Sequence, residues 1–514
     1  MRVTNSKGWI AVTCLSLFAA GGCGHSNDDS GSNSGNGGAN ASGGQPSGGA
    51  TNAAGNTSTA GAPSSGGAAS GGASGNGGSS APNGGMASGG AGASSGGGSP
   101  GTGGNGPTAG AGTSGGASGS GGAAGTSTGG VSNPTGARFP FPANQRSSRC
   151  TYPKSASAAD AQRAYDTWKT EILTSDGAGG HLRVKRPNSP GAEVNSTVSE
   201  GIAYGMLLSV AMADQHTFDE LWKYSQKWTN SNGLMNWYIN AAGTQALGTG
   251  AATDADEDIA WALVMAHRQW GGAGSLDKPY LELAQSQIDA IWRTEVDHNQ
   301  SDMLLPGDTW GSNPLFNPSY FAPNQYRIFG EVTGKTDDWN RVIATGYTII
   351  EKSLNASSKN ASNGLVPAWC GSDGMPKSPP SGSATNYQYD SARTPYRIGL
   401  DYCFNGEPRA KDYLAKISSF FAGVGAGSIV DGYNLDGTPR PDPDSPSGSP
   451  QSAVFVGCAA VGAMHDATYQ SFIDDAYTRV ATGTLLARSR YYNLSWTALN
   501  LLMLTGNFAE YPKP

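Results

Sequence analysis

Residues 24–135 constrain the fold most, because they contain almost nothing from which a hydrophobic core can be built. This stretch consists largely of Gly, Ser, Ala, Asn, Thr and Pro, and more than half of the 78 glycines lie before residue 136. Such a sequence buries too little apolar surface to offset the entropy lost on ordering. We therefore expect a disordered, flexible tether over 24–135. The folded part is then one domain over 136–514, which is long enough to bury a large core.

The N-terminus has the pattern of an export signal. Arg2 and Lys7 precede an apolar run over 9–20, and the run ends in small residues before Cys23. This order predicts a signal peptide over 1–23 and a protein that is extracellular or at the cell surface. The run is too short to span a membrane stably. Ala-Gly-Gly-Cys also resembles a bacterial lipobox, although Ala stands where Leu is usual, so secretion and lipid anchoring through Cys23 both stay open.

Charge and cysteine content exclude several classes of partner. The net charge is −7 and no segment forms a basic stripe, so we expect no nucleic-acid partner. Four cysteines remain after the signal region, and their spacing matches no zinc site. In an exported protein they can form up to two disulfides, with the pairing open. These are Cys150, Cys370, Cys403 and Cys458.

After residue 136 the apolar residues recur every three to four positions, which predicts helices. We expect about twelve helices and no sustained strand, which suits an all-α toroid of six helix pairs. Long loops over 231–255, 299–317 and 358–389 carry Trp, Tyr and Asp, and loops of this length are usually functional. The helices are expected to start near Ser157, Ser199, Thr217, Asp256, Leu276, Pro318, Asp337, Ser391, Pro408, Gln451, Ala467 and Tyr491.

Glu200 is the first candidate for chemistry. It opens an otherwise apolar helix in the segment Ser-Glu-Gly-Ile-Ala-Tyr-Gly, where Gly201 and Gly205 allow close packing on one face. Partial desolvation there raises the pKa of a carboxyl group and keeps it protonated, as a general acid requires. A structural role is equally consistent with the pattern: Ser199 as N-cap, with Glu200 favoured by the helix dipole.

A second segment, Ala-Thr-Asp-Ala-Asp-Glu-Asp-Ile over 252–259, places four acidic residues at one helix start. Dipole compensation in the first turn is the structural explanation. A calcium loop is excluded because the sixth position, which should be Gly, is Ile259. The functional alternative places the Asp254 carboxyl in a binding cleft, hydrogen-bonded to a ligand.

Asp390 is the third candidate and also starts a helix, so N-capping is its structural explanation. Arg393 follows one turn later and can pair with Asp390. Such pairing lowers the pKa of the carboxyl group and keeps it ionised, which suits a general base.

These three segments, in this order, resemble glycoside hydrolase family 8, the bacterial inverting endoglucanases, xylanases and chitosanases. The resemblance covers nearly all of 140–510, and Ala-Thr-Asp-Ala-Asp-x-x-Ile-Ala-x-Ala-Leu is similar to the family's specific signature. It implies an (α/α)6 barrel. Glu200 then matches the proton donor, Asp390 the base that activates water, and Asp254 an acid that holds the sugar. Further substrate-binding positions matched by the resemblance are Tyr389, Arg393, Trp237, Trp310 and Tyr320.

The resemblance implies an inverting endo-β-1,4-glucanase that needs no metal or organic cofactor and acts as a monomer on a β-1,4-linked polysaccharide. Inversion requires the two carboxyl groups to lie roughly 6.5–9.5 Å apart, with a water between base and sugar. The similar chitosanases tend to have Asn where Asp390 stands, so this chain is closer to the cellulase and xylanase branch. Three alternatives stay open: an endo-β-1,4-xylanase, a carbohydrate-binding protein without turnover, and a helper of cellulose synthesis.

Overall fold

The computed structural model describes residues 136–311, 314–440, 451–485 and 489–513, so the predicted signal peptide and tether lie outside the described residues. Thirteen α-helices make up most of this part, and none of them is long and apolar enough to cross a membrane. They are α1 (Ala158–Ile172), α2 (Ser199–Ala211), α3 (Gln215–Gln226), α4 (Thr253–Trp270), α5 (Tyr280–Thr294), α6 (Pro323–Thr333), α7 (Thr336–Ser353), α8 (Tyr389–Ala392), α9 (Thr394–Asn405), α10 (Pro408–Val424), α11 (Ala453–Ala463), α12 (Gln470–Ala481) and α13 (Arg490–Thr505).

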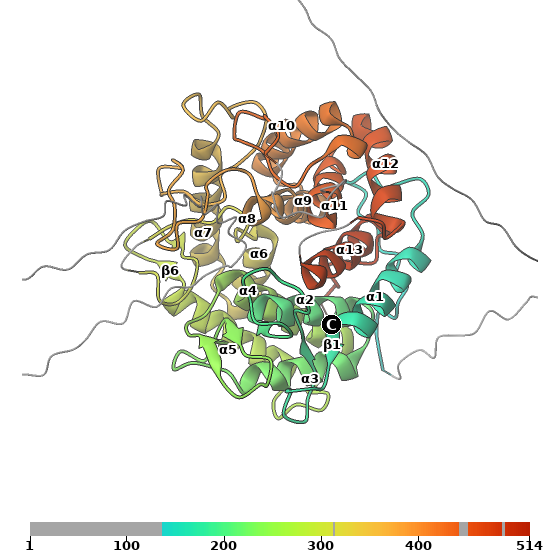
Figure 1. Ribbon diagram of the computed structural model, residues 1–514. Coiled ribbons are helices and arrows are strands. Elements are labelled where there is room, and N and C mark those ends of the chain that lie inside the picture. The colour runs from blue at the N-terminus through green and yellow to red at the C-terminus, as the bar shows by residue number, and fades with distance from the viewer. Residues whose placement is uncertain (1–135, 312–313, 441–450, 486–488, 514) are drawn as a thin grey trace, which may run out of the picture. The chain divides into compact units, whose positions relative to one another are not determined.

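Six helices form a closed inner ring. Helices α2, α4, α6, α9, α11 and α13 each pack on the next, and α13 packs back on α2 (Figure 1). Their sequences explain this position, because several are apolar all round, as expected of helices with neighbours on every side. Every residue of α11 is buried, and so is every residue of α13 after Arg490.

The other six long helices, α1, α3, α5, α7, α10 and α12, cover the ring from outside (Figure 1). Each buries only one face. In α7 the buried residues include Trp339, Val342, Ile343, Gly346 and Ile350, which follow the three-to-four spacing of an amphipathic helix. The predicted all-α toroid of six helix pairs is therefore confirmed.

Two helix predictions need correction. Helix α6 begins at Pro323 rather than near Pro318, because a turn intervenes: the Asn317 side chain accepts from Ser319 N, and its carbonyl accepts from Tyr320 N. The helix expected near Ser391 is divided into the four-residue α8 and then α9.

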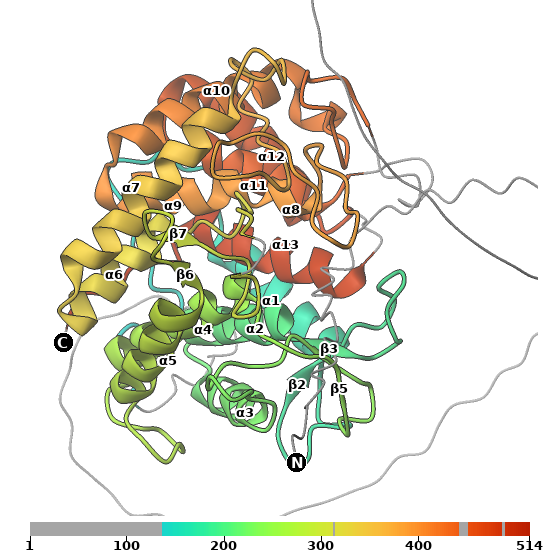
Figure 2. The same cartoon turned by 90° about the vertical axis from the view of Figure 1, so that its left-hand side faces the viewer.

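Seven strands of two or three residues were not predicted, because segments this short show no alternation of apolar and polar residues. Strands β3, β4 and β5 form one sheet, while β1 pairs with β2 and β6 with β7. Strands β2, β3 and β5 lie at the same end of the helix ring as α8 (Figure 2). The strands are β1 (Leu173–Thr174), β2 (Arg183–Val184), β3 (Thr197–Val198), β4 (Tyr238–Ile239), β5 (Ala246–Gly248), β6 (Val296–Asp297) and β7 (Met303–Leu304).

One disulfide, Cys150–Cys403, ties the segment before α1 to α9 across 253 residues of sequence. Cys370 and Cys458 are buried free thiols, so a second disulfide does not form. The two lie in different surroundings: Cys370 contacts the carbonyl of Phe316, and Cys458 is in the middle of α11.

Candidate active site

The candidate site is a cleft at the end of the ring where inner helices α2, α4 and α13 begin. The three predicted acids, Glu200, Asp254 and Asp390, all line it. They reach it from three elements far apart in sequence, α2, α4 and α8. The complete lining is Arg186, Val198, Ser199, Glu200, Trp237, Ala252, Asp254, Tyr320, Asp390 and Tyr491.

Glu200 lies in the first turn of α2, where its two carboxyl oxygens have different partners. Oε2 accepts from Arg393 Nη1 at 2.8 Å, and Oε1 accepts a short hydrogen bond from the Tyr491 hydroxyl. Burial raises the pKa of Glu200 to about 7; Arg393 opposes this rise, and the nearby Asp254 carboxyl adds to it. The predicted desolvation of this carboxyl is confirmed. Near neutral pH a large fraction of Glu200 therefore holds its proton.

Arg393 connects the acids. Its Nη1 lies 2.6 Å from Asp254 Oδ2 and 2.8 Å from Glu200 Oε2, while Nη2 lies 3.9 Å from Asp390 Oδ1. The side chain is 1% exposed and also stacks its guanidinium over the Tyr320 ring. Burial lowers the pKa of Arg393, but the Tyr204 and Tyr492 phenols and the Asp254 and Glu200 carboxyl groups together raise it well above its ordinary value. One buried cation thus holds two carboxyl groups in hydrogen-bonding contact and a third within ion-pair distance.

Asp390 has partners on both oxygens. Oδ2 accepts from Trp369 Nε1 and from Gln388 Nε2, each at 3.2 Å, and Oδ1 faces Arg393. Arg393 lowers the pKa of Asp390, as predicted, but it does not set the net direction of the shift. Burial outweighs Arg393 and raises that pKa to about 6, because the ion pair is long and the carboxyl group is almost fully desolvated. Asp390 is still mainly ionised at pH 7.

The capping roles considered for these segments are not found. Ser199 is the first helical residue of α2 rather than its N-cap, which is Val198 without a side-chain hydrogen bond. The N-cap of α8 is Gln388, whose side chain accepts from Asp390 N. The carboxyl groups of Glu200 and Asp390 therefore cap no helix and instead line the cleft.

The other acids of the α4 segment are structural. Asp258 forms two hydrogen bonds with Arg397, and Glu257 accepts from the Tyr326 hydroxyl. Asp256 accepts from Gln287. All three are buried in the protein interior. Only Asp256 lies in the first turn of α4, where the predicted dipole compensation applies, and Glu257 and Asp258 lie beyond it.

The predicted aromatic positions fall into two groups. Trp237 and Tyr320 line the cleft, and the indole of Trp237 packs so closely on Gly248 that a Cβ there would lie 2.3 Å from it. Trp310 is outside the cleft lining and stacks on Trp369, with ring centroids 5.8 Å apart. The Tyr389 hydroxyl donates to Asp431 at 2.8 Å, so this hydrogen bond connects α8 to the segment that contains Asp431.

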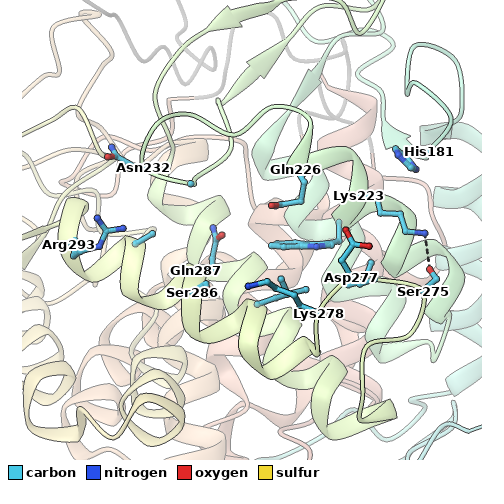
Figure 3. Close-up of a pocket in the computed structure, with 15 residues that line it drawn as sticks. His181, Lys223, Gln226, Asn232, Ser275, Asp277, Lys278, Ser286, Gln287 and Arg293 are labelled. Carbon is cyan, nitrogen blue, oxygen red and sulfur yellow. Dashed lines mark hydrogen bonds between the residues drawn. The ribbon is translucent and has the colours of Figure 1, made fainter.

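A larger hollow lies on the outside of the ring between α3 and α5 (Figure 3). Trp222 and Lys223 of α3 and Gln287 of α5 contribute to its lining, and Lys223 donates to Ser275 there. Among its lining residues Asp277 is the only acid. A pair of carboxyl groups is absent there, so size does not identify the reaction site. Nor does the described part of the chain contain a cluster of three His, Cys, Asp or Glu side chains placed to hold a metal.

Comparison with known proteins decides the family. The model of glycosyl hydrolases family 8 matches residues 145–506. The chain belongs to this family. It is 39% identical over 387 residues to Endoglucanase 2 of Ruminiclostridium josui, covering 72% of this chain and 77% of the relative. It is 38% identical over 347 residues to Endoglucanase A of Acetivibrio thermocellus, covering 67% and 68%.

The solved structure of a glucanase agrees with the ring described above. The structure of a β-1,3-1,4-glucanase from Paenibacillus sp. X4 is 30% identical and superposes with a TM-score of 0.64, over 72% of this chain and 98% of that one. Family membership confirms the resemblance drawn from the three acidic segments, and it makes the chain a glycoside hydrolase.

Three residues of the site escaped the sequence analysis: Tyr491 and Arg186, which line the cleft, and Trp369, which contacts Asp390. Tyr491 belongs to the last inner helix, and no local pattern connects it to Glu200, 291 positions earlier. Trp369 lies in the long loop 358–389, and its indole donates to Asp390. The length of this loop was the one sequence feature that pointed to a functional role for its residues. Arg186 follows β2 without any motif around it.

Proposed function

We propose that this family 8 hydrolase is an endo-β-1,4-glucanase that hydrolyses cellulose-type β-glucan with inversion, with Glu200 as general acid and Asp390 as general base. The observation that carries the proposal is the cleft in which these two carboxyl groups and Asp254 surround Arg393. The endoglucanase names of the relatives support glucan as substrate.

The acid role of Glu200 rests on its protonation. A pKa of about 7 leaves most Glu200 side chains protonated at mildly acidic pH, ready to donate to the glycosidic oxygen. The Tyr491 hydroxyl supports both states, since it can donate to the carboxylate or accept from the acid. The acid can therefore lose and regain its proton in place.

The base role of Asp390 rests on a lower pKa, about 6, and on fixed orientation. Trp369 and Gln388 hold Oδ2, so Oδ1 remains to accept a proton from the attacking water. The carboxyl groups of Glu200 and Asp390 contact different nitrogens of Arg393, and no hydrogen bond joins them. An inverting reaction needs roughly 6.5–9.5 Å between the two carboxyl groups, so that its water fits between base and sugar.

Asp254 and Arg393 position the reacting groups. Asp254 Oδ2 is held at 2.6 Å from Arg393, and its Oδ1 accepts from Ala255 N, so the carboxylate has little freedom. We propose that it binds a hydroxyl of the sugar at the cleavage point. Trp237 and Tyr320 in the cleft lining, and more distantly Trp310 and Tyr389, are proposed to bind or support further sugar units.

We also propose that the protein is exported and works outside the cell or at its surface. The charged, apolar and small-residue order of 1–23 supports a signal peptide, and the Cys150–Cys403 disulfide supports an oxidising compartment. Lipidation of Cys23 is the anchoring variant. A mass spectrum of the mature N-terminus distinguishes the two, and Cys23→Ala abolishes the lipidated form if it exists.

The experiment is reducing-sugar release from mixed-linkage glucan, carboxymethylcellulose, xylan and chitosan, beside Glu200→Gln. We expect release from the two glucans and a fall of kcat by on the order of 10²–10⁴ in the variant, because an amide cannot donate the proton. Release from xylan alone would agree with the proposed mechanism but would mean that the substrate is xylan rather than glucan. Binding without release would leave a carbohydrate-binding protein.

A further inference from the structure

Arg186 is a buried cation in the cleft that has no carboxylate partner. It is 2% exposed and belongs to the cleft lining together with Glu200 and Tyr491. In the part of the chain that the structure describes, no acidic oxygen lies within 4.0 Å of its guanidinium, unlike Arg393 and Arg397, which each have two or more. Burying an unpaired charge is costly, so its retention in a cleft calls for a ligand.

The hydrogen bonds of Arg186 leave one end of the guanidinium available. Nε and Nη2 both donate to a single acceptor, the Ser196 hydroxyl oxygen, at 3.2 and 2.9 Å. The cation lies over the Tyr238 ring, 4.7 Å from its centroid, which fixes its plane. Burial lowers the pKa of Arg186, while Tyr491, Tyr238 and the nearby Glu200 carboxyl favour its charged form, as does a side-chain hydrogen bond with Tyr238. The two hydrogen bonds to Ser196 use Nε and Nη2 and do not involve Nη1.

Arg183, three positions earlier and equally buried, shows what a structural arginine does in this segment. Its Nε, Nη1 and Nη2 all donate to backbone carbonyls, of Asp176, Asn195 and Ala241, and Nη1 also donates to Thr197. An arginine that serves the fold here thus donates to protein acceptors from all three of its nitrogens. Arg186 instead leaves the two N–H groups of Nη1 beside the cleft.

The charge of the cleft indicates what Arg186 selects. Three acids share the single guanidinium of Arg393, and an acidic cleft of this kind favours a cationic sugar. Arg186 adds a second positive charge on the wall next to Glu200. A protonated amino sugar placed there meets a like charge, whereas a neutral glucose unit offers hydroxyl oxygens to Nη1.

We propose that Arg186 is a substrate-binding residue that donates from Nη1 to a hydroxyl oxygen of the sugar beside Glu200, and that it selects neutral glucan against cationic glucosamine polymers. This inference rests on the proposed glucanase function and names the determinant of its substrate class.

The test measures binding in the Glu200→Gln background, where turnover does not interfere. The ligands are cellohexaose and the fully deacetylated glucosamine hexamer, at a pH where its amines are protonated. The variants are Arg186→Met, which removes charge and donors, and Arg186→Lys, which keeps the charge. Lys185→Met is the matched control, because Lys185 carries the neighbouring positive charge but is not in the cleft lining.

For Arg186→Met we expect the Kd of cellohexaose to rise about tenfold and that of the glucosamine hexamer to fall about tenfold. Arg186→Lys should weaken cellohexaose binding but still reject the glucosamine hexamer. Lys185→Met should change neither Kd. Because the hydroxyl contact and the charge act on different ligands, a general loss of folding cannot reproduce this pattern.

Kd values within twofold of the parent for both ligands, in a folded Arg186→Met protein, overturn the proposal. If Arg186→Met does not fold, Arg186→Lys decides: unchanged binding of cellohexaose overturns the proposal. Failure of the proposed function is recognised by a different measurement. In that case the parent enzyme, with Glu200 intact, releases no sugar from glucan.

Discussion

Arg393 Nη1 lies 2.6 Å from Asp254 Oδ2, and this contact connects the start of α4 to the start of α9 at the centre of the cleft. The same nitrogen also donates to Glu200 and to the Tyr204 hydroxyl, so one guanidinium fixes the relative positions of groups from three helices. The carboxyl groups of Glu200 and Asp254, both proposed to act on the substrate, are therefore held by a shared buried cation.

Arg393→Met should both inactivate and destabilise the protein. It leaves Glu200 and Asp254 buried without their cation, which costs on the order of 3–5 kcal/mol of unfolding free energy at neutral pH. Urea unfolding measures this loss, and the loss should shrink at low pH, because Glu200 is then protonated and no longer needs a cation. A loss that is the same at pH 4 and pH 8 would mean that packing, rather than charge, explains the effect.

Trp369→Phe should shift the acidic limb of the pH profile. The indole N–H lowers the pKa of Asp390, so its removal should raise that pKa above about 6. Because the base must be ionised, the acidic limb of kcat/KM moves to higher pH. The control is Trp339→Phe, since Trp339 is a buried tryptophan of α7 whose Nε1 has no partner. An acidic limb that stays in place would remove Trp369 from this role.

Tyr491→Phe should shift the opposite limb. The Tyr491 hydroxyl lowers the pKa of Glu200, so its loss should raise that pKa above about 7. Because the acid must be protonated, the alkaline limb of kcat/KM moves to higher pH while the acidic limb stays. Profiles of both variants, measured side by side, test the assignment of acid and base. A shift of the same limb in both variants would contradict the assignment.

The sequence was sufficient for the fold class and for the three acids, because both depend on local patterns. Apolar residues at three-to-four spacing produce helices whatever their partners, and Glu200, Asp254 and Asp390 each open a recognisable helix. Contacts between residues far apart in the sequence could not be predicted. The contact of Tyr491 with Glu200 spans 291 positions, and the pKa of Asp390 depends on burial that no local pattern encodes.

The cysteines and the α4 acids illustrate the same limit. Four cysteines permitted two disulfides, yet only Cys150–Cys403 forms among the described residues, since pairing depends on which segments the ring brings together. The acids at 256–258 resembled a solvated helix start, but inner helix α4 is surrounded by neighbours and buries them against Gln287, Tyr326 and Arg397.

Asp256 and Glu295 should make the protein less stable as the pH rises. Burial raises both pKa values well above the ordinary range, and neighbouring carboxylates add to the rise: Asp308 for Asp256, and Asp256 for Glu295. The folded state therefore keeps protons that the unfolded chain loses above about pH 4. The unfolding free energy therefore falls with increasing pH above that point. Glu295→Gln removes one of these protons, so we expect a flatter dependence of the urea midpoint between pH 5 and pH 8. The control is Glu282→Gln, because Glu282 is an exposed acid that pairs with Lys278. An equal flattening of the pH dependence in both variants would contradict the prediction.

The most direct test of the central claim is the configuration of the sugar released from cellohexaose, followed by proton NMR before mutarotation. Inversion by Glu200 and Asp390 predicts that the new reducing end appears first as the α-anomer, and that Glu200→Gln gives almost none. Initial appearance of the β-anomer would mean that a carboxylate attacks the sugar directly, and it would contradict the assignment of Asp390 as the base that activates water.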